Sequence, residues 1–178
     1  MTFCVAIHTE NGIVALADTQ ITRGAERNSK TKLATVQGVE GTAFTMTSGL
    51  RSVRDKTVTY LEQDLKQAKS KPTHIYQLVD MFCEKLKQVR EQDETALKKG
   101  GLSFNLHATI GGRLADDDQA MLYYVYPEGN WIESSVDSPY FTSGRTSYGK
   151  PILDRLLTYT TEMPAAVSLA YLAFDATR

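Results

Sequence analysis

Strands and helices are segregated along this chain, and that order constrains the fold more than any other feature. A block of short strand-like segments comes first, two helical segments follow one another directly, strands return, and two helical segments come last. Folds built on a parallel sheet instead alternate strands with helices. The order therefore predicts an α+β fold in which antiparallel sheets are flanked by pairs of helices.

Apolar runs and turn residues define the first block of strands. Residues 2–7 (TFCVAI) predict a strand, and residues 10–12 (ENG) predict a hairpin, because Asn-Gly tolerates the positive φ of tight turns. The continuous apolar run 13–17 (IVALA) predicts a second strand that is buried on both faces. The polar stretch 19–31 shows no periodicity, and two more short strands are expected within residues 32–49.

Two helices are indicated by apolar residues that recur every three or four positions. The first begins at about Arg51, and the second carries a one-sided apolar stripe that favours core packing. Thr73 is the expected N-cap of the second helix, and Gly100-Gly101 is its expected end. The stripe consists of Ile75, Leu78, Val79, Phe82, Leu86 and Val89.

The second half of the chain repeats the sequence of strands and then helices. Alternating apolar residues from Phe104 to Ile110 predict a half-buried strand, and residues 111–119 (GGRLADDDQ) predict a turn. Residues 121–129 predict another strand, and residues 130–144 predict one or two more. The stretches YGKPILDRLL and MPAAVSLAYLAF are expected to be helical.

Composition narrows the class of protein. Among 178 residues, 20 Lys and Arg balance 21 Asp and Glu, and this net charge of -1 is not typical of proteins that bind nucleic acid or anionic membranes. No apolar run reaches the roughly 20 residues that cross a bilayer. We therefore expect a single cytoplasmic domain over residues 1–178.

The cysteines and histidines do not form a ligand set. Cys4 and Cys83 lie far apart in apolar surroundings and are expected to be buried free thiols. His8 lies beyond the first strand and is expected to be solvated. Because the three histidines have no metal-ligand spacing with each other or with the cysteines, neither a metal nor a cofactor is expected.

The first residues suggest a specific chemistry. Removal of Met1 normally follows when the second residue is small, and it would leave Thr2 with a free α-amine, whose reference pKa is about 8 and which can act as a base for the hydroxyl. Asp18 ends the strand that the hairpin pairs with the first, and Lys32 begins the next strand. Residues 47–49 (TSG) offer amides where a strand meets a helix. Taken singly, each of these residues also fits an ordinary structural role.

Several stretches together resemble a known family. The stretches MTFCVAI, GIVALADTQITRG, SKTKLATV and the TSG before a long helix resemble the proteasome β-subunits, which are N-terminal nucleophile (Ntn) hydrolases. With SYGKPILDRLL added, the chain resembles more narrowly the bacterial Anbu branch, the ancestral β-subunits. The resemblance extends to about residue 175. It implies a four-layer αββα sandwich of two antiparallel sheets packed face to face between helix pairs.

The resemblance also implies roles for individual residues. Thr2 would be the catalytic nucleophile and would supply the base, Asp18 and Lys32 would be its charged partners, and Gly49 would donate the oxyanion amide. The remaining implied residues are Thr19, Gln20 and Ile21 in the substrate cleft, with Ser143 or Gly144 in support.

The leading functional hypothesis is a threonine peptidase that cleaves polypeptides within a ring or helical assembly of identical subunits. Any partner ATPase is left open. Chains of this family continue past the last helix with further strands, so a C-terminally truncated domain is expected. Two alternatives remain: an inactive proteasome-like scaffold, and a small-molecule amidase that uses the same nucleophile.

Overall fold

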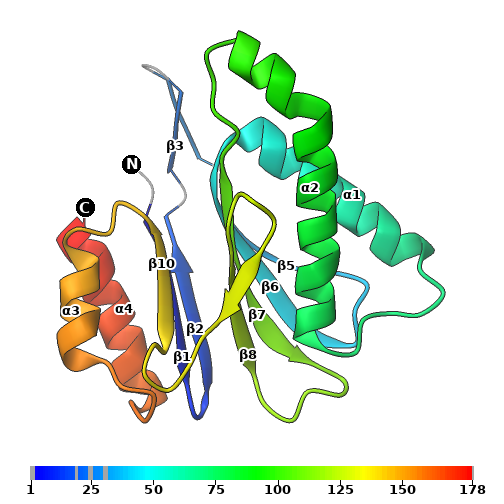
Figure 1. Ribbon diagram of the computed structural model, residues 1–178. Coiled ribbons are helices and arrows are strands. Elements are labelled where there is room, and N and C mark those ends of the chain that lie inside the picture. The colour runs from blue at the N-terminus through cyan, green and yellow to red at the C-terminus, as the bar shows by residue number, and fades with distance from the viewer. Residues whose placement is uncertain (1–2, 19, 24–25, 30–31, 178) are drawn as a thin grey trace.

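Two antiparallel sheets are packed between two pairs of helices (Figure 1). The computed structural model describes residues 3–18, 20–23, 26–29 and 32–177. From one side of Figure 1 to the other, the layers are α3 with α4, a three-stranded sheet, a five-stranded sheet, and α1 with α2. The four-layer αββα sandwich expected from the sequence is confirmed.

The three-stranded sheet is built around the first strand of the chain. β1 (Phe3–Thr9) lies between β2 (Gly12–Ala17) and β10 (Tyr140–Gly144), and both pairings are antiparallel with the order β10-β1-β2. Every residue of β1 is buried. The predicted hairpin at residues 10–12 joins β1 to β2, so it places the end of β2 beside the start of β1.

The five-stranded sheet has the order β5-β6-β7-β8-β9, again antiparallel throughout. A separate two-stranded ribbon connects the two sheets. The strands of the large sheet are β5 (Leu33–Thr35), β6 (Gly41–Gly49), β7 (Leu106–Leu114), β8 (Met121–Val125) and β9 (Trp131–Glu133). The ribbon consists of β3 (Gln20–Arg23) and β4 (Glu26–Ser29).

Each sheet is covered on its outer face by one pair of helices. The two helices of a pair follow one another in the chain, and both pack on the same face of their sheet. The first pair is α1 (Arg51–Gln67) and α2 (Ile75–Lys99), and the second is α3 (Gly149–Leu156) and α4 (Met163–Thr177). The predicted apolar stripe of α2 is fully buried against the five-stranded sheet and α1, and Gly100 is its C-cap as expected. Within the described residues, no helix is long and apolar enough to span a membrane.

Alternating side chains of β1 contribute to two separate cores. Cys4 and Ala6 pack between the two sheets, whereas Val5 and Ile7 pack against α3 and α4. This two-sided burial follows from the period-2 geometry of a strand that has layers on both faces. Both cysteines are buried free thiols, as predicted, and burial raises the pKa of each to about 11.

One expectation about the burial of the first strands is wrong. β2 is half-buried along its whole length rather than buried on both faces, because it is an outer strand of the β10-β1-β2 order. In the polar stretch 19–31, which shows no periodicity in the sequence, the described residues form the β3–β4 ribbon. Cross-strand hydrogen bonding between neighbouring segments stabilises that ribbon without any apolar alternation.

The start of α2 and the length of β7 also differ from the expectations. The N-cap of α2 is His74 rather than Thr73, and the Asp117 carboxylate accepts hydrogen bonds from the Ile75 N–H (3.0 Å) and the Leu114 N–H (2.9 Å).

Residues 111–114 are not part of a turn. They continue β7, because Gly111 lets the Phe44 ring and the Leu122 side chain pack over the strand.

His8 was expected to be solvated, and this is wrong. The side chain lies in the last part of β1 with a residue exposure of only 6%. Its Nδ1 is 2.8 Å from the Ser134 hydroxyl oxygen, and its ring meets the Tyr159 ring edge-on. Burial lowers the pKa of this imidazole.

Candidate functional site

A buried ion pair lies beside the start of β1. Lys32 Nζ is 2.8 Å and 2.7 Å from the two carboxylate oxygens of Asp18, and the side chains are only 7% and 12% exposed. Asp18 follows the last residue of β2, and Lys32 immediately precedes β5. The two sheets therefore each contribute one member of the pair, which the sequence predicted as catalytic partners.

The carboxylate of Asp18 also holds the backbone of the first strand. Its Oδ1 accepts a hydrogen bond from the Phe3 N–H at 3.0 Å, and the Asp18 N–H donates to the Phe3 carbonyl at 3.1 Å. Phe3 directly follows Thr2 in the chain, but Thr2 itself lies outside the described residues. The arrangement brings an ammonium and a carboxylate next to the first described residue of the chain.

β10 brings two further predicted residues to the same end of β1. Ser143 pairs with Cys4, and Gly144 pairs with Phe3. Ser143 is buried and its hydroxyl hydrogen-bonds the Cys4 thiol. The raised pKa of that thiol results mainly from burial and partly from the negative charge of Asp18, while Lys32 and Ser143 oppose the rise. The thiol is therefore protonated at neutral pH and is not poised as a nucleophile.

Gly49 occupies a backbone conformation that favours glycine. It is the last residue of β6, with φ +128°, and a Cβ there would lie 2.4 Å from the Asn105 carbonyl oxygen. The next residue, Leu50, donates its N–H to that same oxygen at 2.8 Å. Two residues earlier, the Thr47 N–H donates to the Lys32 carbonyl at 3.2 Å, so Gly49 and Lys32 lie at the same end of neighbouring strands.

The three predicted substrate-cleft residues are not placed with their side chains. Thr19 lies outside the described residues, and Gln20 and Ile21 are described only as backbone of β3, paired with Ser29 and Asn28. Their assignment to the cleft stays a prediction, as does the role of Thr2. Asp18, Lys32, Gly49, Ser143 and Gly144 are brought to the end of the sandwich where β1 begins.

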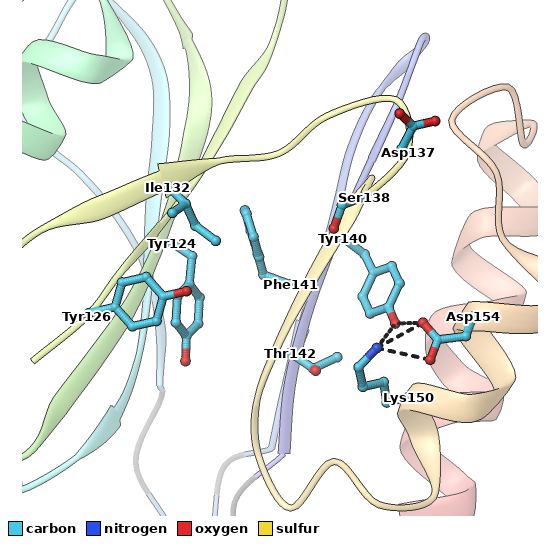
Figure 2. Close-up of a pocket in the computed structure, with 10 residues that line it drawn as sticks. All are labelled: Tyr124, Tyr126, Ile132, Asp137, Ser138, Tyr140, Phe141, Thr142, Lys150 and Asp154. Carbon is cyan, nitrogen blue, oxygen red and sulfur yellow. Dashed lines mark hydrogen bonds and ion pairs between the residues drawn. The ribbon is translucent and has the colours of Figure 1, made fainter.

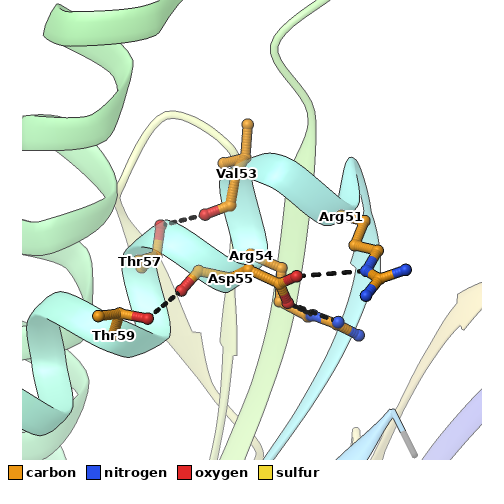
Figure 3. Close-up of polar contacts among 6 residues, drawn as sticks. All are labelled: Arg51, Val53, Arg54, Asp55, Thr57 and Thr59. Carbon is orange, nitrogen blue, oxygen red and sulfur yellow. Dashed lines mark hydrogen bonds and ion pairs between the residues drawn. The ribbon is translucent and has the colours of Figure 1, made fainter. Parts of the chain in front are cut away.

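A charged group at the beginning of α1 was not singled out in the sequence. Figure 3 shows Arg51 and Arg54 directed at the carboxylate of Asp55, with Nε–Oδ2 at 3.2 Å for Arg51 and Nη2–Oδ1 at 2.6 Å for Arg54. Arg54 is only 13% exposed. The signal in the sequence was a charge pair at positions i and i+4, Arg51 and Asp55, which begins one residue after the TSG stretch. These arginines follow Gly49 by two and five residues, so they add positive charge to this part of the chain.

A second polar group surrounds a cavity of about 340 Å³ between β8, β9, β10 and α3 (Figure 2). Tyr140 donates its hydroxyl proton to Asp154, and Lys150 Nζ lies 3.0 Å from the Tyr140 oxygen and 2.9 Å from Asp154 Oδ1. Hydrogen bonds from Tyr140 and Lys150 lower the pKa of Asp154, and burial raises the pKa of Tyr140. Of the predicted catalytic residues, Asp18 and Lys32 are described by the structure, and neither lines this cavity.

The described residues do not present a metal centre. No group of three or more His, Cys, Asp or Glu side chains within the described ranges is arranged to hold a metal ion. The candidate site therefore consists of an ammonium, a carboxylate, a hydroxyl and backbone amides. Such groups are suited to proton transfer and to stabilising an oxyanion.

Two antiparallel sheets between helix pairs define the fold class of the Ntn hydrolases. The family model for proteasome subunits matches residues 2–178, and the chain belongs to the proteasome subunit family. No curated protein sequence matches the chain.

Solved structures of Anbu proteins are similar over nearly the whole chain. Anbu from Yersinia bercovieri is 27% identical with a TM-score of 0.86, and the match covers 98% of this chain and 74% of that one. The Anbu complex from Pseudomonas aeruginosa, described as a helical assembly, is 28% identical with a TM-score of 0.89 and the same coverage. Anbu from Hyphomicrobium sp. strain MC1 is 27% identical with a TM-score of 0.86, again covering 98% and 74%.

Proposed function

We propose that this chain is a threonine-type peptidase of a self-assembled homo-oligomer, with Thr2 as the nucleophile after Met1 is removed. The observation that carries the proposal is the Asp18–Lys32 ion pair, whose carboxylate also binds the Phe3 N–H. That hydrogen bond anchors the residue next to Thr2 to the charged pair. Membership of the proteasome subunit family supports the same assignment.

In the proposed reaction, the Thr2 hydroxyl oxygen attacks the carbonyl carbon of a peptide bond and its proton passes to the α-amine. The Lys32 ammonium favours the neutral form of that amine, because a nearby cation disfavours a second positive charge. The Gly49 N–H stabilises the oxyanion of the tetrahedral intermediate. The ammonium then protonates the leaving amine, and an ester on Thr2 remains.

Water completes the proposed cycle. The free α-amine takes a proton from a water molecule, which attacks the ester carbonyl, and collapse of the second intermediate returns the proton to the Thr2 oxygen. Asp18 orients Lys32 and balances its charge throughout. Ser143 and Gly144 act in support, since β10 holds them beside Cys4 and Phe3.

Self-assembly is part of the proposal. A similar Anbu complex is described as a helical assembly, and the proteasome family supports a multi-subunit arrangement for this chain. We propose a ring or helical homo-oligomer that encloses the sites and limits access to unfolded polypeptides. Light scattering on the purified protein tests this directly, and a monodisperse monomer at micromolar concentration would contradict it.

The decisive experiment combines intact mass with covalent labelling. Intact mass first establishes whether Met1 has been removed, because retention of Met1 blocks the α-amine and leaves the scaffold alternative. Protein that lacks Met1 is then treated with a peptide electrophile that bonds both a hydroxyl and an adjacent amine. We expect one adduct on Thr2, none in Thr2→Ala, and a normal adduct in the control Thr160→Ala.

Substrate class is tested on the same material. Hydrolysis of unfolded polypeptides that disappears in Thr2→Ala supports the peptidase. Turnover confined to small amides, with polypeptides left intact, would replace it with the amidase alternative.

A further inference from the structure

A polar cluster joins the two sheets at the end of β1 that is remote from Asp18 and Lys32. His8 Nδ1 lies 2.8 Å from the Ser134 hydroxyl oxygen, and the ring also donates a hydrogen bond to the Ala120 carbonyl. His8 belongs to the three-stranded sheet, whereas Ala120 precedes β8 and Ser134 follows β9 of the five-stranded sheet. The imidazole is therefore a direct side-chain link between the sheets.

Backbone hydrogen bonds gather three more segments around this imidazole. The His8 N–H donates to the Pro139 carbonyl at 2.7 Å, just before β10. The Glu10 N–H donates to the Tyr159 carbonyl at 3.0 Å, between α3 and α4, and the Tyr159 ring contacts the His8 ring edge-on. Loss of the His8 link would thus affect the connections before β8, after β9 and between α3 and α4.

Both nitrogens of a neutral His8 have a suitable partner. The Ser134 hydroxyl can donate to an unprotonated Nδ1 or accept from a protonated one, and the ring also hydrogen-bonds the backbone of Ala120. A second ring proton would keep these partners, but it would place a positive charge on a side chain that is nearly fully buried. Burial, rather than the hydrogen bonds, is therefore what favours the neutral imidazole.

The surrounding charges do not remove this preference. The hydrogen bond to the Ala120 backbone and the negative charge of Glu133 both favour protonation of His8, but burial outweighs them, and the pKa of His8 is lowered. A cavity of about 300 Å³ adjoins the ring and is lined by Glu10, Arg113, Asp118 and Tyr159 among others. Two acidic groups and one arginine face this cavity, which gives protons a route to the ring.

We propose that His8 is a pH-sensitive latch that holds the far ends of the two sheets together when neutral and releases them on protonation. The direction follows from linkage. The opened state binds a proton with the ordinary histidine pKa of about 6.5, and the closed state binds it less readily. Stability of the closed cluster is therefore complete above about pH 6.5 and is lost as the pH falls below that value. The proposal does not depend on peptidase activity.

Hydrogen exchange of the intact protein tests the latch. Protection of the amides of residues 8–12, 134–138 and 140 is compared at pH 7.5 and pH 5.5 after correction for intrinsic exchange rates. We expect protection in wild type to fall by up to about tenfold, the limit set by a site that protonates only when open. Equal protection at both values would overturn the proposal.

Two variants make the result specific. His8→Gln keeps an acceptor and a donor without titrating, so the pH response should disappear at the cluster. His107→Gln is the matched control, because burial also lowers the pKa of His107 but its ring is bonded to Tyr124 instead. A response that persists in His8→Gln, or that is lost in His107→Gln, would refute the assignment. If His8→Gln does not fold, NMR titration of the His8 ring in wild type decides: its midpoint should lie below 6.5 and coincide with shifts of the Ala120 and Ser134 amides.

Discussion

The two ends of β1 stabilise their polar groups in opposite ways. At the start, Phe3 is held by the carboxylate of a charged pair, Asp18 and Lys32, that keeps slight contact with solvent. At the far end, His8 uses hydrogen bonds to Ser134 and Ala120, and among the described residues no charged side chain forms an ion pair with its ring. One strand thus has a charged end and a neutral end.

The difference between the charged and the uncharged end of β1 follows from the role proposed for each end. A charge pair in a protein interior costs desolvation energy that the attraction between its members does not always repay. The charged end is where the terminal-threonine chemistry is proposed. The neutral end joins the two sheets, for which satisfied uncharged hydrogen bonds are sufficient. Removing one partner should therefore have larger effects at the charged end.

The largest effect is expected for Lys32→Ala. Without the ammonium, the α-amine of Thr2 is protonated more readily and is a poorer base, so turnover should fall by about 10²–10⁴-fold. Initial rates on a peptide whose cleavage depends on Thr2 measure the loss. Lys150→Ala removes an exposed lysine that pairs with Asp154 and should leave the rate unchanged. A Lys32→Ala enzyme with the wild-type rate would remove this lysine from the mechanism.

Asp18→Ala should cause the largest loss of stability. It leaves the Lys32 ammonium buried without this carboxylate and removes the acceptor of the Phe3 N–H, at a cost of about 3 kcal/mol in the free energy of unfolding. Asp154→Ala breaks a pair whose side chains are half-exposed, and it should cost less than about 1 kcal/mol. Urea unfolding of both variants makes the comparison, and equal losses would show that the Asp18 pair behaves like a surface pair.

Gly49→Ala tests the backbone at the charged end. The positive φ and the closeness of the Asn105 oxygen should together cost about 2–3 kcal/mol in the free energy of unfolding. Gly101 also has a positive φ, +74°, but no atom within 4 Å of a Cβ, so Gly101→Ala should cost only about 1 kcal/mol. Thermal unfolding of the two variants separates steric contact from φ strain. A smaller loss for Gly49→Ala than for Gly101→Ala would contradict the geometry.

The smallest effect is expected at the neutral end. Ser134→Ala leaves Nδ1 of His8 without its hydroxyl partner and should cost about 1–2 kcal/mol at pH 7.5. The exposed Ser168, whose hydroxyl bonds the Pro164 carbonyl within α4, provides the matched control, and Ser168→Ala should change stability by less than about 0.5 kcal/mol. Chemical unfolding at fixed pH measures both. A loss for Ser134→Ala as large as that for Asp18→Ala would erase the distinction between the two ends.

Much of the fold was predictable because it follows from local periodicity. The 3.6-residue stripe from Ile75 to Val89 indicated a core helix, and the stripe is buried as expected. The Asn-Gly turn paired the first two strands, which is why Asp18 could be placed near Thr2 from sequence reasoning alone. The Asp18–Lys32 contact itself was inferred from a family resemblance, and the structure brings these two side chains together.

The incorrect predictions concern properties that depend on distant segments. Thr73 has the residue type of an N-cap, but the Asp117 carboxylate from the turn before β8 binds the first N–H of α2, and the helix begins one residue later. The run IVALA in β2 is apolar enough for two-sided burial, but its outer position in the sheet leaves it half-exposed. Neither fact is encoded in the residues around the element concerned.

His8 shows the same limit most clearly. Its local sequence describes a polar residue near a turn, and only the packing of Ser134, Ala120 and Tyr159 around it makes it a buried link between sheets. The sequence by itself determined the order of elements, the hairpin and the helical stripes, because these depend on neighbours in the chain and on side-chain period. The tertiary structure decided which polar groups are buried and what they bind, because burial and hydrogen-bond partners arise from contacts between segments that are far apart in sequence.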